Sequence, residues 1–212
     1  PEMKTIYHLS GLPRSGNTLL SSILNQNPKI NTTPLSDLNY LMVESHDKYM
    51  SSKLRKNFPD LKSFDNAMSS FYYNFYKDWP GDIIIHFGEL KVIDKYIKND
   101  FKCIVLVRDL FEVLASFIKL YKADKNFFVN KNRSTDQSKI EGLLDKDSII
   151  KNSLDSIYNL YYGWYDSCLF IQYNNLVNNT KQEIDKIYKF LEIEPFDHSY
   201  INLNQFKVNN IS

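Results

Sequence analysis

Short apolar runs alternate along this chain with longer segments of helical periodicity, and this alternation limits the folds open to it. The runs at 82–87 (DIIIHF), 102–107 (KCIVLV) and 168–173 (CLFIQY) are almost continuously apolar, as in strands covered on both faces. A further strand is expected at 5–9. Such strands, separated by helices, predict an α/β fold: a P-loop-like three-layer sandwich with a central, mainly parallel sheet of about five strands and helices on both faces.

Helices are expected between these strands. Helical periodicity and end signals place them at 17–25, 36–50, 61–79, 109–121, 147–166 and 181–191, with a shorter one at 91–98. The polar stretch at 123–146 has little periodicity and is predicted to be a variable loop or lid. The length of 212 residues suits one domain, 1–212, with this stretch as an excursion.

Composition excludes several classes of protein. The net charge is +1, which gives no case for nucleic-acid or membrane-surface binding, although a small anionic ligand needs only a local positive site. No apolar run approaches the ~20 residues of a membrane span, and the N-terminal segment lacks the apolar core of a signal peptide, so a cytoplasmic protein is expected. Cys103 and Cys168 lie in apolar runs without metal-ligand spacing, so we expect free thiols and no metal site.

The segment Gly11 to Thr18 (GLPRSGNT) lies between a predicted strand and a predicted helix. Its glycines allow backbone N–H groups to turn around an anion, and the following helix adds the positive end of its dipole. The loop is therefore expected to bind a phosphate. A Walker A loop has Lys directly before the Ser or Thr, whereas here that residue is Asn17 and the cation, Arg14, lies inside the loop. This departure argues against ATP or GTP hydrolysis.

The segment GLPRSGNTLL resembles the 5′-phosphosulfate loop of the sulfotransferase superfamily, which typically reads G-x-P-[RK]-S-G-[TS]-T. Arg at the fourth position is similar to bacterial and tyrosylprotein-type members. A second segment, LVRDLFEVLASF, resembles the family's 3′-phosphate motif, in which Arg108 and Ser116 would hold the phosphate. A third and weaker match, IQYNNLVNN, would place Tyr173 near the nucleotide.

The resemblance implies a sulfotransferase that moves the sulfuryl group of 3′-phosphoadenosine 5′-phosphosulfate (PAPS) to a hydroxyl or amine acceptor and releases 3′-phosphoadenosine 5′-phosphate (PAP). The acceptor would be a small molecule, a glycan or a peptide, and neither a metal nor a nucleic acid is implied. The implied nucleotide-binding residues are Pro13, Arg14, Ser15, Gly16, Asn17, Thr18, Arg108, Ser116 and Tyr173.

In-line transfer needs cations for the developing charge and a base for the acceptor proton. Arg14 is the expected cation. Cytosolic sulfotransferases carry their catalytic His 22 residues before the 3′-phosphate Arg, and His86 lies at that distance from Arg108. The Glu that tyrosylprotein sulfotransferases use is absent, with Asp37 nearby as an alternative base, and Glu89 is a further alternative.

Two other functions stay open on the sequence. A P-loop kinase would need a loop Lys and a carboxylate for Mg²⁺, and Asn17 argues against the first requirement. A catalytically weak PAP- or PAPS-binding protein would retain the two phosphate motifs without an effective base. The identity of the acceptor and the oligomeric state are not predicted.

Overall fold

The computed structural model describes residues 4–33, 36–88, 93–97, 101–123, 133, 135–146, 148–201 and 203. Its strands form a five-stranded, all-parallel sheet in the order β2-β3-β1-β4-β5, which confirms the predicted α/β class. The strands are β1 (Thr5–Gly11), β2 (Ile30–Thr33), β3 (Ile83–Phe87), β4 (Cys103–Val107) and β5 (Cys168–Gln172).

The chain divides into two compact units, neither of which is continuous in sequence. Unit 1 comprises residues 1–9, 20–103 and 196–212, and unit 2 comprises residues 10–19 and 104–195. Both cysteines are free thiols, as predicted. Within the described residues, no helix has the length and apolar character needed to cross a bilayer.

Unit 1 is organised around the pairing of β1 and β2 with β3. Thr5 pairs with Ile83 and His8 with His86, so two histidines lie side by side in the interior. Strand β2, which the sequence analysis did not locate, pairs Thr33 with His86 on the other edge of β3. Its sequence, INTT, has four residues of which three are polar, which explains why periodicity did not indicate a strand.

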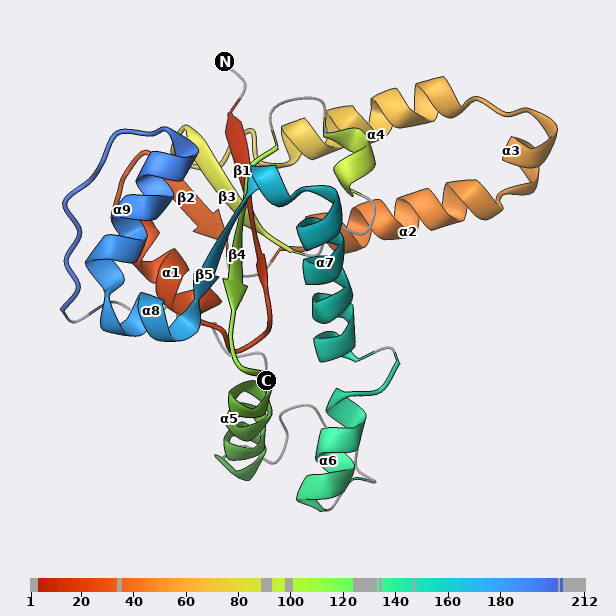
Figure 1. The fold of residues 1–212 in the computed structure, drawn as a ribbon. Coiled ribbons are helices and arrows are strands. Elements are labelled where there is room, and N and C mark those ends of the chain that lie inside the picture. Colours follow the sequence, from red (N-terminus) through yellow and green to blue (C-terminus); the bar gives the residue numbers. More distant parts are fainter. Residues whose placement is uncertain are drawn as a thin grey trace. The chain divides into compact units, whose positions relative to one another are not determined.

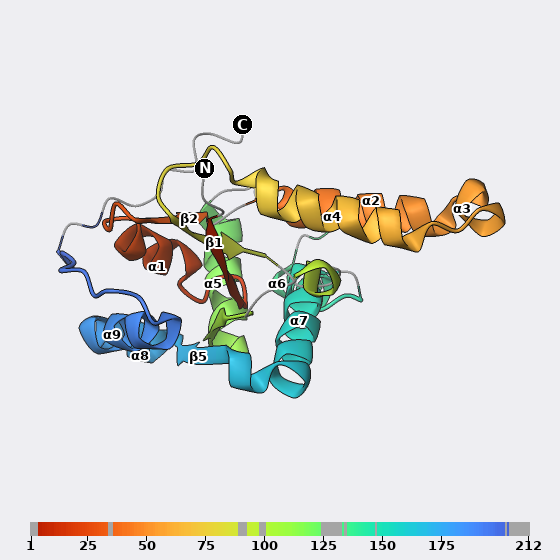
Figure 2. The same ribbon diagram turned by 90° about the horizontal axis from the view of Figure 1, so that it is seen from above.

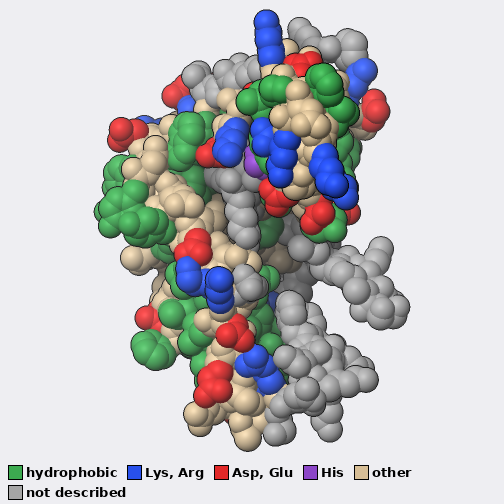
Figure 3. Space-filling model, turned by 90° about the vertical axis from the view of Figure 1, so that its right-hand side faces the viewer, with side chains coloured by type: hydrophobic (Ala, Val, Ile, Leu, Met, Phe, Trp, Pro, Cys, Tyr) green, Lys and Arg blue, Asp and Glu red, His purple; other side chains and the backbone are tan. Residues whose placement is uncertain are grey.

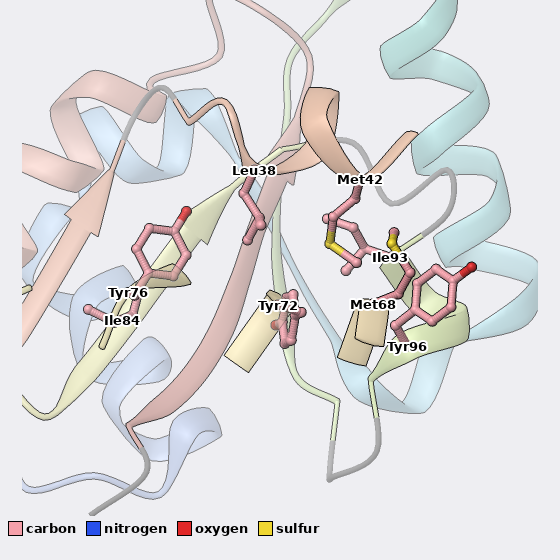
Figure 4. Packing of buried hydrophobic residues seen from close by; sticks show 8 residues of the cluster. All are labelled: Leu38, Met42, Met68, Tyr72, Tyr76, Ile84, Ile93 and Tyr96. Carbon is pink, nitrogen blue, oxygen red and sulfur yellow. The ribbon is translucent and has the colours of Figure 1, made fainter. Parts of the chain in front are cut away.

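A helical hairpin covers part of unit 1. Helices α2 (Leu38–Ser51) and α4 (Leu61–Phe75) lie side by side, and the short α3 (Lys53–Asn57) lies at the far end of the pair (Figures 1 and 2). The predicted helices at 36–50 and 61–79 correspond to α2 and α4. Met68 and Tyr72 of α4 and Tyr76, directly after it, pack into the core together with the short 3-10 helix at Ile93–Tyr96 (η1). Figure 4 shows the core residues Leu38, Met42, Met68, Tyr72, Tyr76, Ile84, Ile93 and Tyr96.

Unit 2 contains the remaining helices: α5 (Leu110–Ala123), α6 (Asp136–Leu143), α7 (Ile149–Gly163), α8 (Tyr173–Asn178) and α9 (Thr180–Leu191), with a 3-10 turn at Tyr165–Ser167 (η2). Helix α1 (Asn17–Leu24) begins in unit 2 and continues in unit 1. The core of unit 2 packs α5, α6 and α7 together through Leu12, Val113, Leu114, Phe117, Leu143 and Ile150.

Helix α6 lies inside the stretch 123–146, for which we predicted a loop or lid. A capping box begins the helix: the Thr135 side chain accepts from the backbone N–H of Ser138, and the Ser138 side chain accepts from that of Thr135. The helix has no continuous apolar stripe; the capping box and a few apolar contacts, such as that of Leu143, stabilise it. Residues 124–132 and 134 of the predicted lid lie outside the described residues.

Candidate functional site

The loop between β1 and α1 has an unusual backbone. Gly11, Arg14 and Gly16 have φ values of 150°, 65° and 98°, so the chain turns through conformations that L side chains rarely adopt. A Cβ on Gly11 would lie 2.3 Å from the carbonyl oxygen of Leu106, so only glycine fits beside β4 there. Arg14 adopts the left-handed conformation despite its side chain, a form of strain that often occurs at functional sites.

Hydrogen bonds to one carbonyl group close this loop. The backbone N–H of Ser15 donates to the Leu12 oxygen at 3.3 Å, and Asn17 Nδ2 donates to the same oxygen at 3.3 Å. The buried Ser15 hydroxyl also donates to it. The Asn17 amide, at the position of the Walker lysine, therefore stabilises the loop. Pro13 is half-buried in the loop, and Thr18 is exposed in the first turn of α1.

Arg108 follows directly after β4, at the carboxyl end of that strand. The next residue, Asp109, caps α5, with its Oδ1 accepting from the backbone N–H groups of Phe111 at 2.9 Å and Glu112 at 3.2 Å. The Glu112 carboxylate accepts from Arg108 Nε at 2.9 Å. Asp109 thus begins the helix, and the Glu112 carboxylate orients the Arg108 side chain.

Within unit 2 the two predicted phosphate motifs come together. Arg14 Nε donates to the hydroxyl of Ser116 at 3.1 Å, and Arg108 Nη1 donates to the backbone oxygen of Arg14 at 2.8 Å. The Arg108 guanidinium also lies 3.9 Å from the ring centroid of Tyr173, the first residue of α8. Gly16 lies beside the same ring, because a Cβ there would be 3.2 Å from Tyr173 Cδ2. We call Arg14, Gly16, Arg108, Ser116 and Tyr173 the arginine cluster.

The arginine cluster is positively charged. Among the described residues, Glu112 is the single carboxylate within ion-pair distance of either arginine, and its side chain is 42% exposed. Anionic phosphate and sulfate groups need several hydrogen-bond donors and positive charge. The cluster offers two guanidinium groups, a hydroxyl and the backbone of a glycine loop at a helix N-terminus. The residues present therefore fit the phosphates of PAP or PAPS.

His86 lies in unit 1 within β3 and is fully buried. Its Nδ1 is 2.5 Å from the Tyr76 hydroxyl, and its Nε2 is 2.8 Å from Asn39 Oδ1. Because an amide oxygen only accepts, Nε2 carries the proton and Nδ1 accepts from Tyr76. The Tyr76 oxygen in turn lies 2.6 Å from the hydroxyl of Ser36. Burial lowers the pKa of His86 to about 3, so the ring is neutral near pH 7.

Of the two alternative bases, the structure describes Asp37 but not Glu89. Asp37 is exposed at the N-terminus of α2, and its side chain makes no capping hydrogen bond there. Glu89 lies outside the described residues.

Sequence reasoning missed one buried titratable group, His8 of β1. Its ring stacks on Tyr72 at a centroid distance of 5.9 Å, and its Nε2 lies 2.7 Å from the hydroxyl of Tyr72. Burial first, and then the neighbouring His86, lower the pKa of His8 well below its ordinary value. A histidine between apolar residues in a strand expected to be buried was the available signal.

Comparison with known proteins shows the family of this chain. The sequence model of the sulfotransferase family matches residues 9–198. The chain belongs to the sulfotransferase family. A search of curated proteins finds no match.

Three solved structures with the same fold are distant from this chain in sequence. The sulfotransferase domain from the curacin biosynthetic pathway aligns with a TM-score of 0.59 at 20% identity, covering 92% of this chain and 76% of that one. A sulfotransferase from Alicyclobacillus acidocaldarius aligns with a TM-score of 0.61 at 12% identity, covering 94% and 85%. A mouse sulfotransferase complexed with PAP aligns with a TM-score of 0.57 at 18% identity, covering 92% and 61%. At these identities the likeness establishes the fold.

Proposed function

We propose that this sulfotransferase binds PAPS at the arginine cluster and transfers its sulfuryl group to a hydroxyl or amine of a small-molecule, glycan or peptide acceptor. The observation that carries the proposal is the contact between two motifs far apart in sequence: Arg14 donates to Ser116, and Arg108 donates to the backbone oxygen of Arg14. The mouse sulfotransferase of the same fold is complexed with PAP, which supports the same nucleotide here.

Each residue of the site has a proposed role. Arg108 and Ser116 hold the 3′-phosphate, and Tyr173 packs against the Arg108 guanidinium and keeps it in place. The backbone of Ser15, Gly16 and Asn17, with Thr18 at the start of α1, holds the 5′-phosphate. Arg14, whose side chain reaches a neutral hydroxyl and no carboxylate among the described residues, contacts the 5′-phosphate and neutralises charge on the oxygens of the transferring group.

The acceptor must lose a proton, and we propose His86 as its base, with Asp37 and Glu89 as alternatives. In the present hydrogen-bond arrangement, Asn39 accepts the proton of His86 Nε2. An acceptor hydroxyl can use this nitrogen only after it displaces Asn39 and the ring takes the tautomer with the proton on Nδ1. The oxygen of Tyr76, which lies against Nδ1, can accept that proton. His86→Gln and Asp37→Asn variants, compared by turnover at equal PAP affinity, distinguish these bases.

Two free cysteines suit a reducing compartment, and we propose that the protein works in the cytoplasm.

Calorimetric titration with PAP tests the nucleotide site. Arg14→Ala and Arg108→Ala should each weaken PAP binding by about 10- to 150-fold, because each removes a charge-assisted contact of roughly 1.5–3 kcal/mol. Arg133→Ala is the matched control, since Arg133 pairs with Asp145 and contacts no residue of the arginine cluster in the described structure. Unchanged affinity in the Arg14 and Arg108 variants, or preferred binding of ATP with Mg²⁺, would contradict the proposal and favour a P-loop kinase.

A further inference from the structure

The far end of the α2–α4 hairpin in unit 1 differs in chemistry from the rest of the hairpin. We call residues 48–62 the hairpin tip; it comprises the end of α2, all of α3 and the turn into α4. Toward the sheet, the hairpin packs through Met42, Met68 and Tyr72. None of the core residues of unit 1 lies in the tip. Stability of the core therefore does not explain which side chains the tip carries.

The hairpin tip is strongly basic. Between residues 48 and 62 the chain carries Lys48, Lys53, Arg55, Lys56 and Lys62 against the single carboxylate Asp60. Asp60 caps α4, with its Oδ1 accepting from the backbone N–H of Ser63 at 3.0 Å. Among the described residues, no carboxylate forms an ion pair with the five cations, and all four lysines are exposed. The overall charge of +1 conceals this local excess.

Large apolar side chains are exposed among these cations. Phe58 is 74% exposed, Leu54 is 69% exposed and Leu61 is 44% exposed. Figure 3 views the side on which α3 lies in Figure 1, and its upper part shows blue Lys and Arg side chains beside green hydrophobic ones, with some red carboxylates. A single exposed apolar residue is ordinary on a protein surface. Here three of them lie inside one span of eight residues, among the cations of the tip, and form a patch that is both apolar and basic.

We propose that the hairpin tip docks on an anionic lipid bilayer. The cations match the negative surface of such a bilayer, and the apolar side chains enter the boundary between headgroups and acyl chains. A favourable dipole interaction explains Lys48 at the end of α2 and Arg55 and Lys56 at the end of α3, but not Lys53 or Lys62. A water-soluble polyanion would satisfy the cations, yet it would leave Leu54 and Phe58 in water.

The test is co-sedimentation of the full chain with phosphatidylcholine vesicles that contain or lack phosphatidylserine. We expect sedimentation only with phosphatidylserine, weakening as salt rises. Lys53→Glu/Lys56→Glu/Lys62→Glu should lower vesicle affinity by more than about 100-fold, because each juxtamembrane cation contributes roughly five-fold. The matched control, Lys77→Glu/Lys119→Glu/Lys189→Glu, changes the net charge equally at exposed lysines outside the tip and should lower vesicle affinity far less. Circular dichroism checks that both variants are folded.

A second variant, Leu54→Ser/Phe58→Ser, keeps every charge and removes the two most exposed apolar groups of the tip. It should lose at least ten-fold in vesicle affinity at raised salt, where the apolar contribution dominates. The proposal is overturned if the chain ignores phosphatidylserine or if the two charge variants lose affinity equally. Binding to soluble polyphosphate as tight as vesicle binding, with no effect of Leu54→Ser/Phe58→Ser, also overturns it and identifies a water-soluble polyanion as the partner.

Discussion

At the scale of residues, single hydrogen bonds, one ion pair and one ring contact fix the side-chain positions of the arginine cluster. Ser116 accepts from Arg14, and Arg108 is oriented by Glu112 on one side and by the ring of Tyr173 on the other. Arg108 Nη1 also donates to the backbone oxygen of Arg14, and no carboxylate among the described residues pairs with Arg14. The charge of Arg14 is therefore available to the anionic ligand that we propose.

Ser116 offers the mildest test of this arrangement. Replacing Ser116 by Ala removes one neutral hydroxyl and should weaken PAP binding by about five- to ten-fold, corresponding to roughly 1 kcal/mol. The melting temperature should change little, because the Arg14 side chain that bonds it is exposed. Calorimetry and thermal melting, with the exposed Ser70→Ala on α4 as control, check both expectations. A loss of stability that matches the loss of affinity would mean that Ser116 has a structural role.

At the scale of elements, the position of the loop from Gly11 to Thr18 depends on how closely β1 and β4 approach each other. Leu12 N–H donates to the Leu106 oxygen at 3.2 Å, and Gly11 lies against the same carbonyl group. Glycine is required there by both its φ of 150° and the space available. Strand β4 thus both positions the loop and requires glycine at residue 11.

Gly11→Ala should lower the free energy of unfolding by about 3 kcal/mol, because the new methyl group meets the Leu106 carbonyl and the φ is strained. Gly163→Ala is the control: nothing lies within 4 Å of its Cβ, and it ends α7, where alanine should be neutral or stabilising. Urea denaturation of both variants measures the difference. Equal stability of the two would mean that the strand and loop shift easily.

The sequence predicted the elements whose pattern is strong and missed those set by local or tertiary contacts. The apolar runs that became β3, β4 and β5 were found, as were α2, α4 and α5. Strand β2 was missed because only its pairing with β3 makes it a strand, and α6 was missed because a capping box begins it. Two sequence motifs predicted Arg14, Arg108 and Ser116 as site residues; the structure brings the three together, and their roles stay predictions. The hydrogen bonds of His86 and His8 were not predictable, because Asn39 of α2, Tyr72 of α4 and Tyr76 directly after α4 supply the partners.

At the scale of the whole molecule, the buried histidines link stability to pH. The pKa of His86 falls to about 3 on folding, and that of His8 also falls. Between pH 3 and an ordinary histidine pKa near 6.5, the unfolded chain binds more protons than the folded one at these residues. Stability should therefore be fully present above pH 6.5 and decline as the pH falls through this range.

The loss attributable to His86 is at most about 5 kcal/mol, since each pKa unit corresponds to about 1.36 kcal/mol. Urea denaturation at a series of pH values measures it, and His86→Gln should flatten the profile although it lowers stability at pH 7. His46, which is not fully buried and lies on α2 beside Asp47, provides the control His46→Gln. A profile that is equally steep in His86→Gln would show that other groups cause the acid sensitivity.

The position of β1 in the sheet also affects how the protein folds during its synthesis. Strand β1 lies between β3 and β4, yet Ile83, the residue that pairs with Thr5, is synthesised long after it. At about 5–20 residues per second, β1 leaves the ribosome roughly 4–16 s before the first strand that pairs with it is complete. An apolar strand with both edges unpaired for that time is a natural target for chaperones, and slowing translation upstream of β3 should increase its aggregation in the cell.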